Sequence, residues 1–492
     1  MLENLLDVIR ANNLVTDLTK GRFGIEVEEH RLLQDGKLSR HVHPTAFGSR
    51  TFHPYLQSDF SETQTELITG PADSSDDALR KLAVLQDILR KNLQPDELIW
   101  PLSMPPRLTA ADYQWLDDTF ARTWYQEYRD YLKGKYGLDR EIMTGVHINF
   151  SLNETFLTKL YDSYYHADFT SFVAFKNTAY FKIVQRFAMY RWLFTYLFGA
   201  APFSENASMP IPSEFQAEPV RSFRASKFGF NNADDEDITA SYASLTDHLA
   251  ALDQAVTDHT FFSADEFYGP VRLKGQATSA DYLTDGIHYL EFRIFDTDPF
   301  DINGISSTTL DFFHLFAMFA LAMDNPAPTA EELSASRELN HMVALENPTD
   351  PSMIAEGASH LLQILDSFID ALGLDNRYRV AVRMAKSRVE DPTTTPAARL
   401  ARQEINGSIF SWGMQQARDF NDAWHEDDKY TLPTLAFLPD TEQQVIKAAV
   451  EKGLMTSLND DDSLEVADKH YATTTNWADL LNNFPAAHSI KF

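Results

Sequence analysis

Cysteine is absent from all 492 residues of the chain, and this absence removes several kinds of chemistry at once. A chain without thiols has no disulfide, no thiolate metal site and no cysteine nucleophile. Basic residues are also few: 42 lysines and arginines stand against 72 aspartates and glutamates, a formal net charge of −30 at pH 7. Such a surface repels phosphate backbones and anionic lipids over long range. We therefore expect neither a nucleic-acid partner nor a membrane partner.

Long apolar runs are lacking as well. The most apolar stretch, residues 312–323, contains His314 and is too short to span a bilayer. The N-terminal segment, residues 1–10, mixes acidic with apolar residues and does not resemble a secretory signal. These features predict a cytoplasmic protein. The sequence carries no signal for an oligomeric state.

Several familiar catalytic motifs are missing too. The chain has no P-loop, no glycine-rich dinucleotide fingerprint, no HExxH zinc motif and no GxSxG elbow. A phosphate site would therefore depend on metal ions and arginines. The composition, with 44% hydrophobic and 12% aromatic residues, is that of a globular protein with its own core.

Period-two alternation of apolar and polar residues predicts four strands, at residues 21–33, 58–71, 145–152 and 289–296. The pair Asp35-Gly36 indicates a tight hairpin turn after the first of them. Helical spacing covers residues 78–93 and 169–197, and the chain beyond Asn325 is expected to be mostly helical. Strands dispersed among helices, with a tight hairpin, favour an α+β fold with an antiparallel sheet.

The polar faces of the predicted strands carry acids and one histidine. Residues two apart on a strand share a face, which unites Glu26 with Glu28, and Glu62 with Glu66. His147 and Glu291 occupy polar positions of the other two strands. If all four strands join one sheet, the crowded carboxylates would need cations to offset their repulsion. Carboxylate oxygens with one imidazole suit Mg²⁺ or Mn²⁺.

Two plainer interpretations of these acids remain open on spacing alone. An outward-facing glutamate on a strand is commonly a solvated surface residue, and His147 could be a hydrogen-bonded structural histidine. A paired-carboxylate glycosidase would use two of the acids, but it would leave the others and Arg293 unexplained.

Eight segments of the chain together resemble a known family. In chain order they are FGIEVEEHRL, SDFSETQTELITGP, WPLSMPP, TGVHINFSL, YLFGAAP, SFRASKFGF, YGPVRLK and YLEFRIFDTDPF. This order resembles that of the bacterial glutamate-cysteine ligases and covers about Gly21 to Phe300. The resemblance implies a glutamine synthetase-like fold, a curved and mainly antiparallel sheet that forms a funnel surrounded by helices. We expect one catalytic domain over residues 1–492, with residues 326–492 as a mostly helical part packed on it.

The resemblance also implies a reaction. Such enzymes join the γ-carboxylate of L-glutamate to L-cysteine through γ-glutamyl phosphate, giving γ-glutamylcysteine, ADP and phosphate, the first step of glutathione biosynthesis. ATP and Mg²⁺ are implied, with Mn²⁺ as a substitute. Fused relatives continue into an ATP-grasp domain that makes glutathione. A chain that stops at Phe492 is expected to make only the dipeptide.

Site residues follow from the same resemblance, position by position. The implied metal set and its neighbour are Glu26, Glu28, Glu62, Glu66, His147 and Glu291. The implied cations for glutamate, phosphate and nucleotide are Arg224, Arg272, Lys274 and Arg293. The implied wall of the cysteine pocket is Phe60, Tyr128, Leu132 and Tyr268. Asp59 is our hypothesis for the group that orients the cysteine ammonium and accepts its proton.

Two positions depart from the family pattern. Phe230 stands where a tyrosine is expected near the cysteine carboxylate, and Glu141 stands where a glutamine is expected. Both leave the amine acceptor open, so a γ-glutamyl ligase that uses another amine is one alternative. A catalytically inactive acidic binding protein is the other, although a retired site would have no reason to keep clustered like charges.

Overall fold

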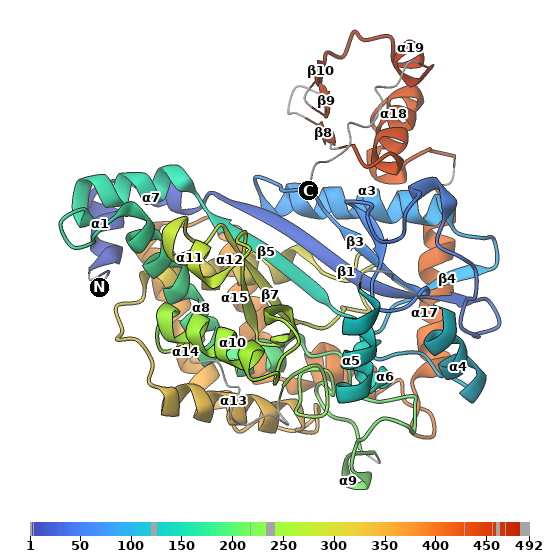
Figure 1. The fold of residues 1–492 in the computed structure, drawn as a ribbon, viewed down its shortest axis with the longest axis horizontal. Helices are drawn as coiled ribbons and strands as arrows, with labels where there is room; N and C mark the ends of the chain where they lie inside the picture. Colours follow the sequence, from blue (N-terminus) through green and yellow to red (C-terminus); the bar gives the residue numbers. More distant parts are fainter. Residues whose placement is uncertain are drawn as a thin grey trace.

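One antiparallel sheet runs through the middle of the molecule (Figure 1). The structure is a computed structural model, and it describes residues 2, 4–119, 125–216, 218–232, 242–427, 429–454, 456–458, 463–467 and 469–482. In spatial order the strands are β2 (Leu56–Ser58), β3 (Gln64–Ile68), β1 (Gly21–Leu33), β5 (Val146–Leu152), β7 (Tyr289–Phe295) and β6 (Val271–Lys274), and β4 (Glu97–Trp100) pairs with β1 off this path. Every pairing in this sheet is antiparallel, which confirms the predicted α+β class.

Helices cover the sheet and fill most of the rest of the described chain. Those before residue 300 are α1 (Leu5–Ala11), α2 (Val15–Leu18), α3 (Ser75–Asn92), α4 (Ala110–Thr119), α5 (Gln126–Tyr136), α6 (Leu138–Glu141), α7 (Glu154–Leu160), α8 (Phe172–Phe198), α9 (Ser213–Gln216), α10 (Leu245–Thr257) and α11 (Ser279–Thr284). Those after it are α12 (Ser307–Ala322), α13 (Ala330–Ala344), α14 (Ala355–Leu372), α15 (Asn376–Glu390), α16 (Pro396–Ala401), α17 (Phe410–His425), α18 (Asp440–Glu451) and α19 (Trp477–Asn482). A search of the described residues finds no helix with the length and apolar character that crossing a membrane requires.

The alternation of the strands sorts their side chains to two faces. Apolar residues of β1, β5 and β7 are buried against α8 and α12, and the ring of Phe292 lies 4.4 Å from that of Phe187 and 4.7 Å from that of Phe313. Fully burying one such phenylalanine stabilises the fold by about 1.5–3 kcal/mol. Because successive strand residues point to opposite faces, the acidic neighbours of these apolar residues lie on the face that α8 and α12 leave uncovered.

The turn predicted at Asp35-Gly36 is confirmed. Gly36 has a φ of 85°, which favours glycine, and its N–H donates to the carbonyl oxygen of Leu33 at 2.8 Å. After the turn, the returning chain pairs with β1 through a single β-bridge, between Leu32 and Leu38, and forms no strand of its own. The end of β1 pairs with β4 instead, so the first strand has a long-range partner that the local pattern did not indicate.

The strand predicted over residues 58–71 is wrong as one continuous element. It is the hairpin β2–β3, and its turn is closed by the N–H of Asp59 on the carbonyl oxygen of Gln64 at 2.9 Å. The alternation of apolar and polar residues continues past Ser58, but the polar residues between Ser58 and Gln64 form a turn that ends the strand. Glu62 therefore lies in a turn and does not share the strand face of Glu66.

The mostly helical C-terminal part is confirmed, with one addition. Helix α13 begins with a capping box, since Glu332 N–H donates to Thr329 Oγ1 at 3.2 Å and Thr329 N–H donates to Glu332 Oε2 at 2.8 Å. Near the end of the chain, β8 (Thr456–Leu458), β9 (Leu464–Val466) and β10 (Lys469–Tyr471) form a second, three-stranded sheet that the sequence did not predict.

Candidate active site

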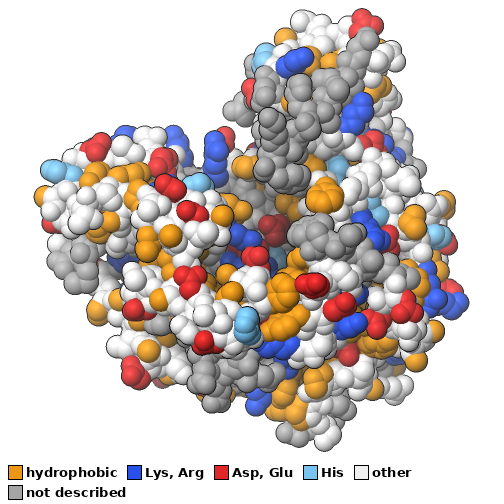
Figure 2. All heavy atoms as spheres, in the orientation of Figure 1, with side chains coloured by type: hydrophobic (Ala, Val, Ile, Leu, Met, Phe, Trp, Pro, Cys, Tyr) orange, Lys and Arg blue, Asp and Glu red, His pale blue; other side chains and the backbone are white. Residues whose placement is uncertain are grey.

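The uncovered face of the large sheet borders a cavity of about 380 Å³. Figure 2 shows this side of the molecule hollowed near the middle of the view, with acidic and basic side chains gathered in the hollow. The lining residues are Glu26, Glu28, Asp59, Phe60, Glu66, Tyr125, Tyr128, Leu132, Glu141, Met143, His147, Arg224, Phe230, Asp265, Tyr268, Arg272, Lys274, Glu291 and Arg293. Sixteen of the seventeen positions singled out from the sequence are therefore in one place, and Glu62 is the exception.

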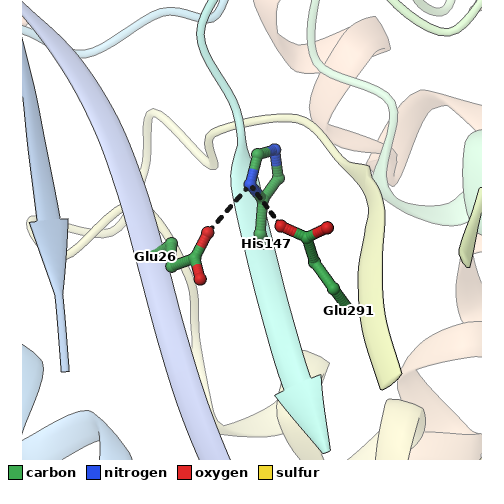
Figure 3. A group of neighbouring side chains, drawn as sticks. All are labelled: Glu26, His147 and Glu291. Carbon is green, nitrogen blue, oxygen red and sulfur yellow. Dashed lines mark hydrogen bonds and ion pairs between the residues drawn. The ribbon is translucent and has the colours of Figure 1, made fainter. Parts of the chain in front are cut away.

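Strand register places three metal-type ligands side by side on neighbouring strands (Figure 3), and all three line the cavity. Glu26 of β1 pairs with His147 of β5, and Glu291 of β7 pairs with Asn149 two residues along β5. His147 Nδ1 lies 3.2 Å from Glu26 Oε2 and 3.9 Å from Glu291 Oε1. One potential ligand atom from each of the three residues lies within 4.8 Å of the other two.

Glu28 and Glu66 extend this group, because they are direct partners in the β1–β3 ladder. Glu28 Oε2 accepts a hydrogen bond from the N–H of Gly145 at 3.0 Å, and Glu28 Oε1 lies 3.7 Å from His147 Nε2. Burial, followed by the charge of Asp59, raises the pKa of Glu28 to about 8. Without bound cations, the carboxylates of this site repel one another, and this repulsion disfavours their ionised forms.

Fixed cations line the Glu291 side of the cavity. The Glu291 carboxylate lies 3.2 Å from Arg293 Nη1, 3.5 Å from Lys274 Nζ and 3.8 Å from Arg272 Nη1. Burial alone would raise the pKa of Glu291, but the three positive charges outweigh it and lower that pKa. Glu291 is therefore held as an anion although it is only 2% exposed.

The donor set fits a hard divalent cation. Burial, followed by repulsion from Arg293, lowers the pKa of His147 to about 4, so its imidazole is neutral near pH 7. Nε2 makes no hydrogen bond within the described chain, so in the tautomer whose Nδ1 donates to Glu26 the lone pair of Nε2 is available to a metal ion. Glu291 Oε2 likewise accepts no hydrogen bond there. Carboxylate oxygens and one neutral imidazole nitrogen are ligands that Mg²⁺ and Mn²⁺ accept.

Arg224 reaches the cavity across a glycine. Its Nη1 donates to the carbonyl oxygen of Phe295 at 3.1 Å and lies 3.5 Å from Asp296 Oδ1. A Cβ atom at Gly145 would lie 2.1 Å from Arg224 Nη2, so only glycine leaves room for the guanidinium. Gly145 thus has two roles, because its N–H also binds Glu28.

An apolar pocket adjoins the charged group. Its walls are the buried side chains of Phe60, Tyr128, Leu132 and Tyr268. The ring of Phe230 lies 4.2 Å from that of Tyr268, and the Arg293 guanidinium carbon lies 5.4 Å from the Phe230 ring centroid. The pocket therefore opens directly beside Arg293.

Glu141 closes the far wall of this pocket. It is buried, and its carboxylate accepts a hydrogen bond from the Tyr268 hydroxyl at 3.3 Å. Burial, followed by the charge of Asp59, raises the pKa of Glu141 to about 8. A protonated Glu141 presents a neutral carboxyl group, which resembles the amide of the glutamine expected at this position.

The β2–β3 turn presents Asp59 to the cavity and turns Glu62 away from it. Asp59 Oδ2 accepts a hydrogen bond from Gln64 Nε2 at 3.0 Å. Glu62 accepts one from the N–H of His43 at 2.7 Å and forms an ion pair with Arg50. We therefore omit Glu62 from the metal set and retain Asp59 beside it.

Four residues of the site were not singled out from the sequence. Asn149 Nδ2 donates to Glu26 Oε1 at 2.7 Å and orients that carboxylate, although Asn149 is not among the residues that line the cavity. Its place two residues after His147 on one strand was a usable signal. Tyr125, Met143 and Asp265 line the cavity from outside the strands, where no periodic pattern marks them.

Comparisons with known proteins identify relatives of this chain. Residues 6–264 and 257–343 match the family described as glutamate-cysteine ligase. The glutathione biosynthesis bifunctional protein GshAB of Streptococcus thermophilus is 34% identical over 467 residues, which are 94% of this chain and 59% of that protein. The protein of the same name from Enterococcus faecalis is 37% identical over 372 residues, or 75% of this chain and 48% of that protein.

Two solved structures have a similar fold. The bifunctional glutathione synthetase of Pasteurella multocida superposes with a TM-score of 0.87 at 32% identity, over 94% of this chain and 61% of that chain. A glutamate–cysteine ligase from Francisella tularensis, solved in complex with AMP, superposes with a TM-score of 0.74 over 88% of this chain and 94% of that chain. At 22% identity the latter supports the fold alone. The chain spans about 59% of the length of the first curated relative it matches.

Proposed function

The chain belongs to the glutamate-cysteine ligase family, and from this premise we propose that it joins the γ-carboxylate of L-glutamate to the amine of L-cysteine with ATP. The products are γ-glutamylcysteine, ADP and phosphate, and the reaction is the first step of glutathione biosynthesis. The observation that carries the proposal is one cavity that combines five metal-type ligands, four cations and a small apolar pocket. Phosphoryl transfer needs the first two, and recognition of a small amino acid needs the third.

Glu26, Glu28, Glu66, His147 and Glu291 are our candidates to hold Mg²⁺, or Mn²⁺ in its place. When bound, such ions neutralise phosphate oxygens and polarise the transferred phosphoryl group. The nucleotide substrate is part of the reaction that we propose from the family match. Arg272 and Lys274 of β6 are our candidates to contact the nucleotide phosphates, because both face Glu291 across the β6–β7 ladder.

In the first step, an oxygen of the glutamate γ-carboxylate attacks the γ-phosphorus of ATP, and ADP leaves. Arg293 and Arg224 supply fixed positive charge toward the substrate anions, and a guanidinium has no proton to lose near neutral pH. The product, γ-glutamyl phosphate, is readily hydrolysed by water. Arg224 is buried and Arg293 is partly buried, and together with the aromatic wall of the adjoining pocket they limit the access of water.

In the second step, the acceptor amine loses a proton and attacks the acyl carbon, and phosphate leaves. Asp59 is our candidate to orient the ammonium group and accept its proton, because it lines the cavity beside Phe60 of the apolar pocket. The hydrogen bond that Gln64 donates to Asp59 Oδ2 fixes the orientation of this carboxylate at the cavity wall.

Changing Asp59 to Asn should slow amide formation by about a hundredfold and leave ADP formation from ATP and glutamate unchanged. Asparagine has the shape of aspartate but accepts no proton. Rapid-quench single turnovers, with ADP and γ-glutamylcysteine measured in the same samples, would separate the two steps. Normal single-turnover amide formation in a variant that still binds Mn²⁺ would remove Asp59 from this role.

Glu141 should make acceptor binding depend on pH. Because its pKa is raised to about 8, Glu141 is neutral at pH 7 and becomes an anion as the pH rises through 8. The KM for L-α-aminobutyrate, an acceptor without a titrating thiol, should increase about three- to tenfold from pH 7 to pH 9 as repulsion from this carboxylate develops. Glu141→Gln should flatten this dependence, whereas Glu127→Gln, an exposed change on α5, should keep it. If KM changed with pH to the same extent in the unmodified protein, Glu141→Gln and Glu127→Gln, Glu141 would not be the group that titrates.

The function itself is tested by one incubation. The protein with ATP, Mg²⁺, L-glutamate and L-cysteine should release ADP and yield γ-glutamylcysteine by mass spectrometry. Adding glycine shows whether the product is extended to glutathione. A parallel panel of amines tests the second candidate, a γ-glutamyl ligase for another acceptor, which Phe230 and Glu141 favour. Stabilisation by Mg-ATP on heating without ADP release would indicate an inactive binding protein.

We also propose that the chain acts as one catalytic unit. The helices after residue 326 contact α8 directly: Arg388 Nη1 donates to the carbonyl oxygen of Leu197 and the Tyr196 hydroxyl donates to that of Arg388, both at 2.7 Å. These contacts join the C-terminal helices to the helix that supports β7. The cytoplasm, where ATP and glutamate are supplied, is our proposed location.

A further inference from the structure

A second cavity, of about 630 Å³, lies along α8, and no described residue lines both it and the active-site cavity. Helix α8 packs beneath the apolar face of β7, so the two cavities are on opposite sides of the sheet. One face of α8 forms the floor of the cavity, with Ala174, Asn177, Thr178, Phe181, Lys182 and Gln185 at helical spacing. The first turn of α10 and residues 324–327 form two of its walls. Its volume falls within the range of small-molecule sites.

The floor of this cavity carries positive charge in a chain whose formal net charge is −30. Lys182 is half-buried, and among the described residues no carboxylate lies within ion-pair distance of its ammonium group. Burial, followed by repulsion from Arg186, lowers the pKa of Lys182 to about 8. Among the described lining residues the one acid is Asp324, which is exposed; its charge acts on Lys182, but the two form no ion pair. Lys182 therefore faces the cavity as a cation without a bound counter-charge.

Arg186 lies one turn further along the same face and is only 5% exposed. Its Nη2 donates to the carbonyl oxygens of Asn325 and Pro326, both at 2.7 Å, and its Nε is buried with no hydrogen-bond partner in the described chain. No carboxylate forms an ion pair with Arg186 within that part of the chain. Arg186 is thus a buried guanidinium held by neutral carbonyls, with Glu332 as a negative charge that acts on it without forming an ion pair.

Helix α10 points its N-terminus at the same space. Ser244, Leu245 and Thr246 line the cavity, and Ser244 is the N-cap, with its hydroxyl occupied by Asp247. The first N–H groups of a helix have no partner within the helix, and the macrodipole makes this end positive. The helix end thus adds to the field of Lys182 and Arg186, although the Asp247 carboxylate in its first turn offsets part of this contribution.

Apolar side chains complete the walls. Leu2, Phe181, Leu245 and Leu283 all line the cavity, and Leu283 is 49% exposed although it is large and apolar. An inorganic anion alone would leave these surfaces in water. We propose that this cavity binds a small organic anion, in which a carboxylate, sulfonate or phosphate group meets Lys182 and an apolar or aromatic body covers the leucines and Phe181.

The probe for this site is anilinonaphthalene sulfonate, a fluorescent molecule that has both parts, and its neutral counterpart is phenylnaphthylamine. In the full-length protein, Lys182→Met should weaken binding of the sulfonate by about tenfold, because one charge-assisted contact is lost, and should leave binding of the neutral dye unchanged. Thr178→Trp should abolish binding of both dyes, since the new side chain fills the floor of the cavity. Circular dichroism and ligase activity verify that each variant is folded.

A matched control lies on the same helix. Lys176 forms an ion pair with Glu154 and does not line the cavity, so Lys176→Met makes the same change of charge outside the site. This variant should bind both dyes as the unmodified protein does. Equal affinity of Lys182→Met and Lys176→Met for the sulfonate would overturn the proposal. Dye binding that survives Thr178→Trp would overturn it as well, whatever the ligase assay gives.

Discussion

Glu291→Gln should lower the rate of Mg-ATP-dependent γ-glutamylcysteine formation by at least about a thousandfold. Glu291 is an anion at the junction of the proposed metal ligands and three cations, with 3.2 Å to Arg293 and 3.5 Å to Lys274. Glutamine fills the same space but carries no charge, so the cations lose their shared counterion and the metal set loses a ligand. Steady-state ADP release, coupled to product detection, measures the loss.

The control for this change is a glutamate outside the cavity. Glu154→Gln alters a side chain that is 58% exposed, and it should leave turnover unchanged. Titration with Mn²⁺ followed by electron paramagnetic resonance should show weakened binding in Glu291→Gln and normal binding in Glu154→Gln. Turnover near the unmodified level in folded Glu291→Gln would exclude the proposed site.

Arg293→Met should reduce kcat/KM by about a thousandfold, as expected when a partly buried group that stabilises transition-state charge is removed. Arg293 contacts Glu291, lies 3.5 Å from His147 Nδ1 and faces the ring of Phe230, so it joins the metal side of the cavity to the acceptor pocket. Lysine keeps the charge but not the planar fork of donors. Arg293→Lys should therefore recover only part of the activity.

An arginine on β1 provides the comparison. Arg22 is 70% exposed at its side chain and lies near Asp73 at the sheet surface, so Arg22→Met should leave kcat/KM unchanged. The KM for glutamate and the KM for ATP, measured separately in Arg293→Met, show which substrate the guanidinium binds. If Arg293→Met and Arg22→Met were equally active, Arg293 would have no part in the reaction.

The faces of the strands were predictable from the sequence, but their neighbours were not. Period-two alternation assigned Glu26, His147 and Glu291 to polar faces, because a strand has only two sides. That Glu26 lies opposite His147, with Glu291 on the next strand, depends on pairing between distant segments. The family resemblance supplied the grouping that alternation lacks.

Where alternation failed, local hydrogen bonding had replaced the strand. The alternating letters continue from Ser58 through Glu66, yet the bond from Asp59 to Gln64 reverses the chain between them. Glu62 then forms an ion pair with Arg50 and does not line the cavity. Residues such as Asp265 enter the cavity from irregular segments, and no periodicity marks such positions.

The order of the strands in the sheet has a consequence for biosynthesis. During translation, β1 leaves the ribosome long before β7, because the helices α3 to α11 separate them along the chain. The acidic face of β1 therefore lacks the cations of β6 and β7 until these last strands of the central sheet have been synthesised. Non-local pairing of this kind folds slowly. A growing polypeptide consequently lacks the complete candidate active site until its last large strand has docked.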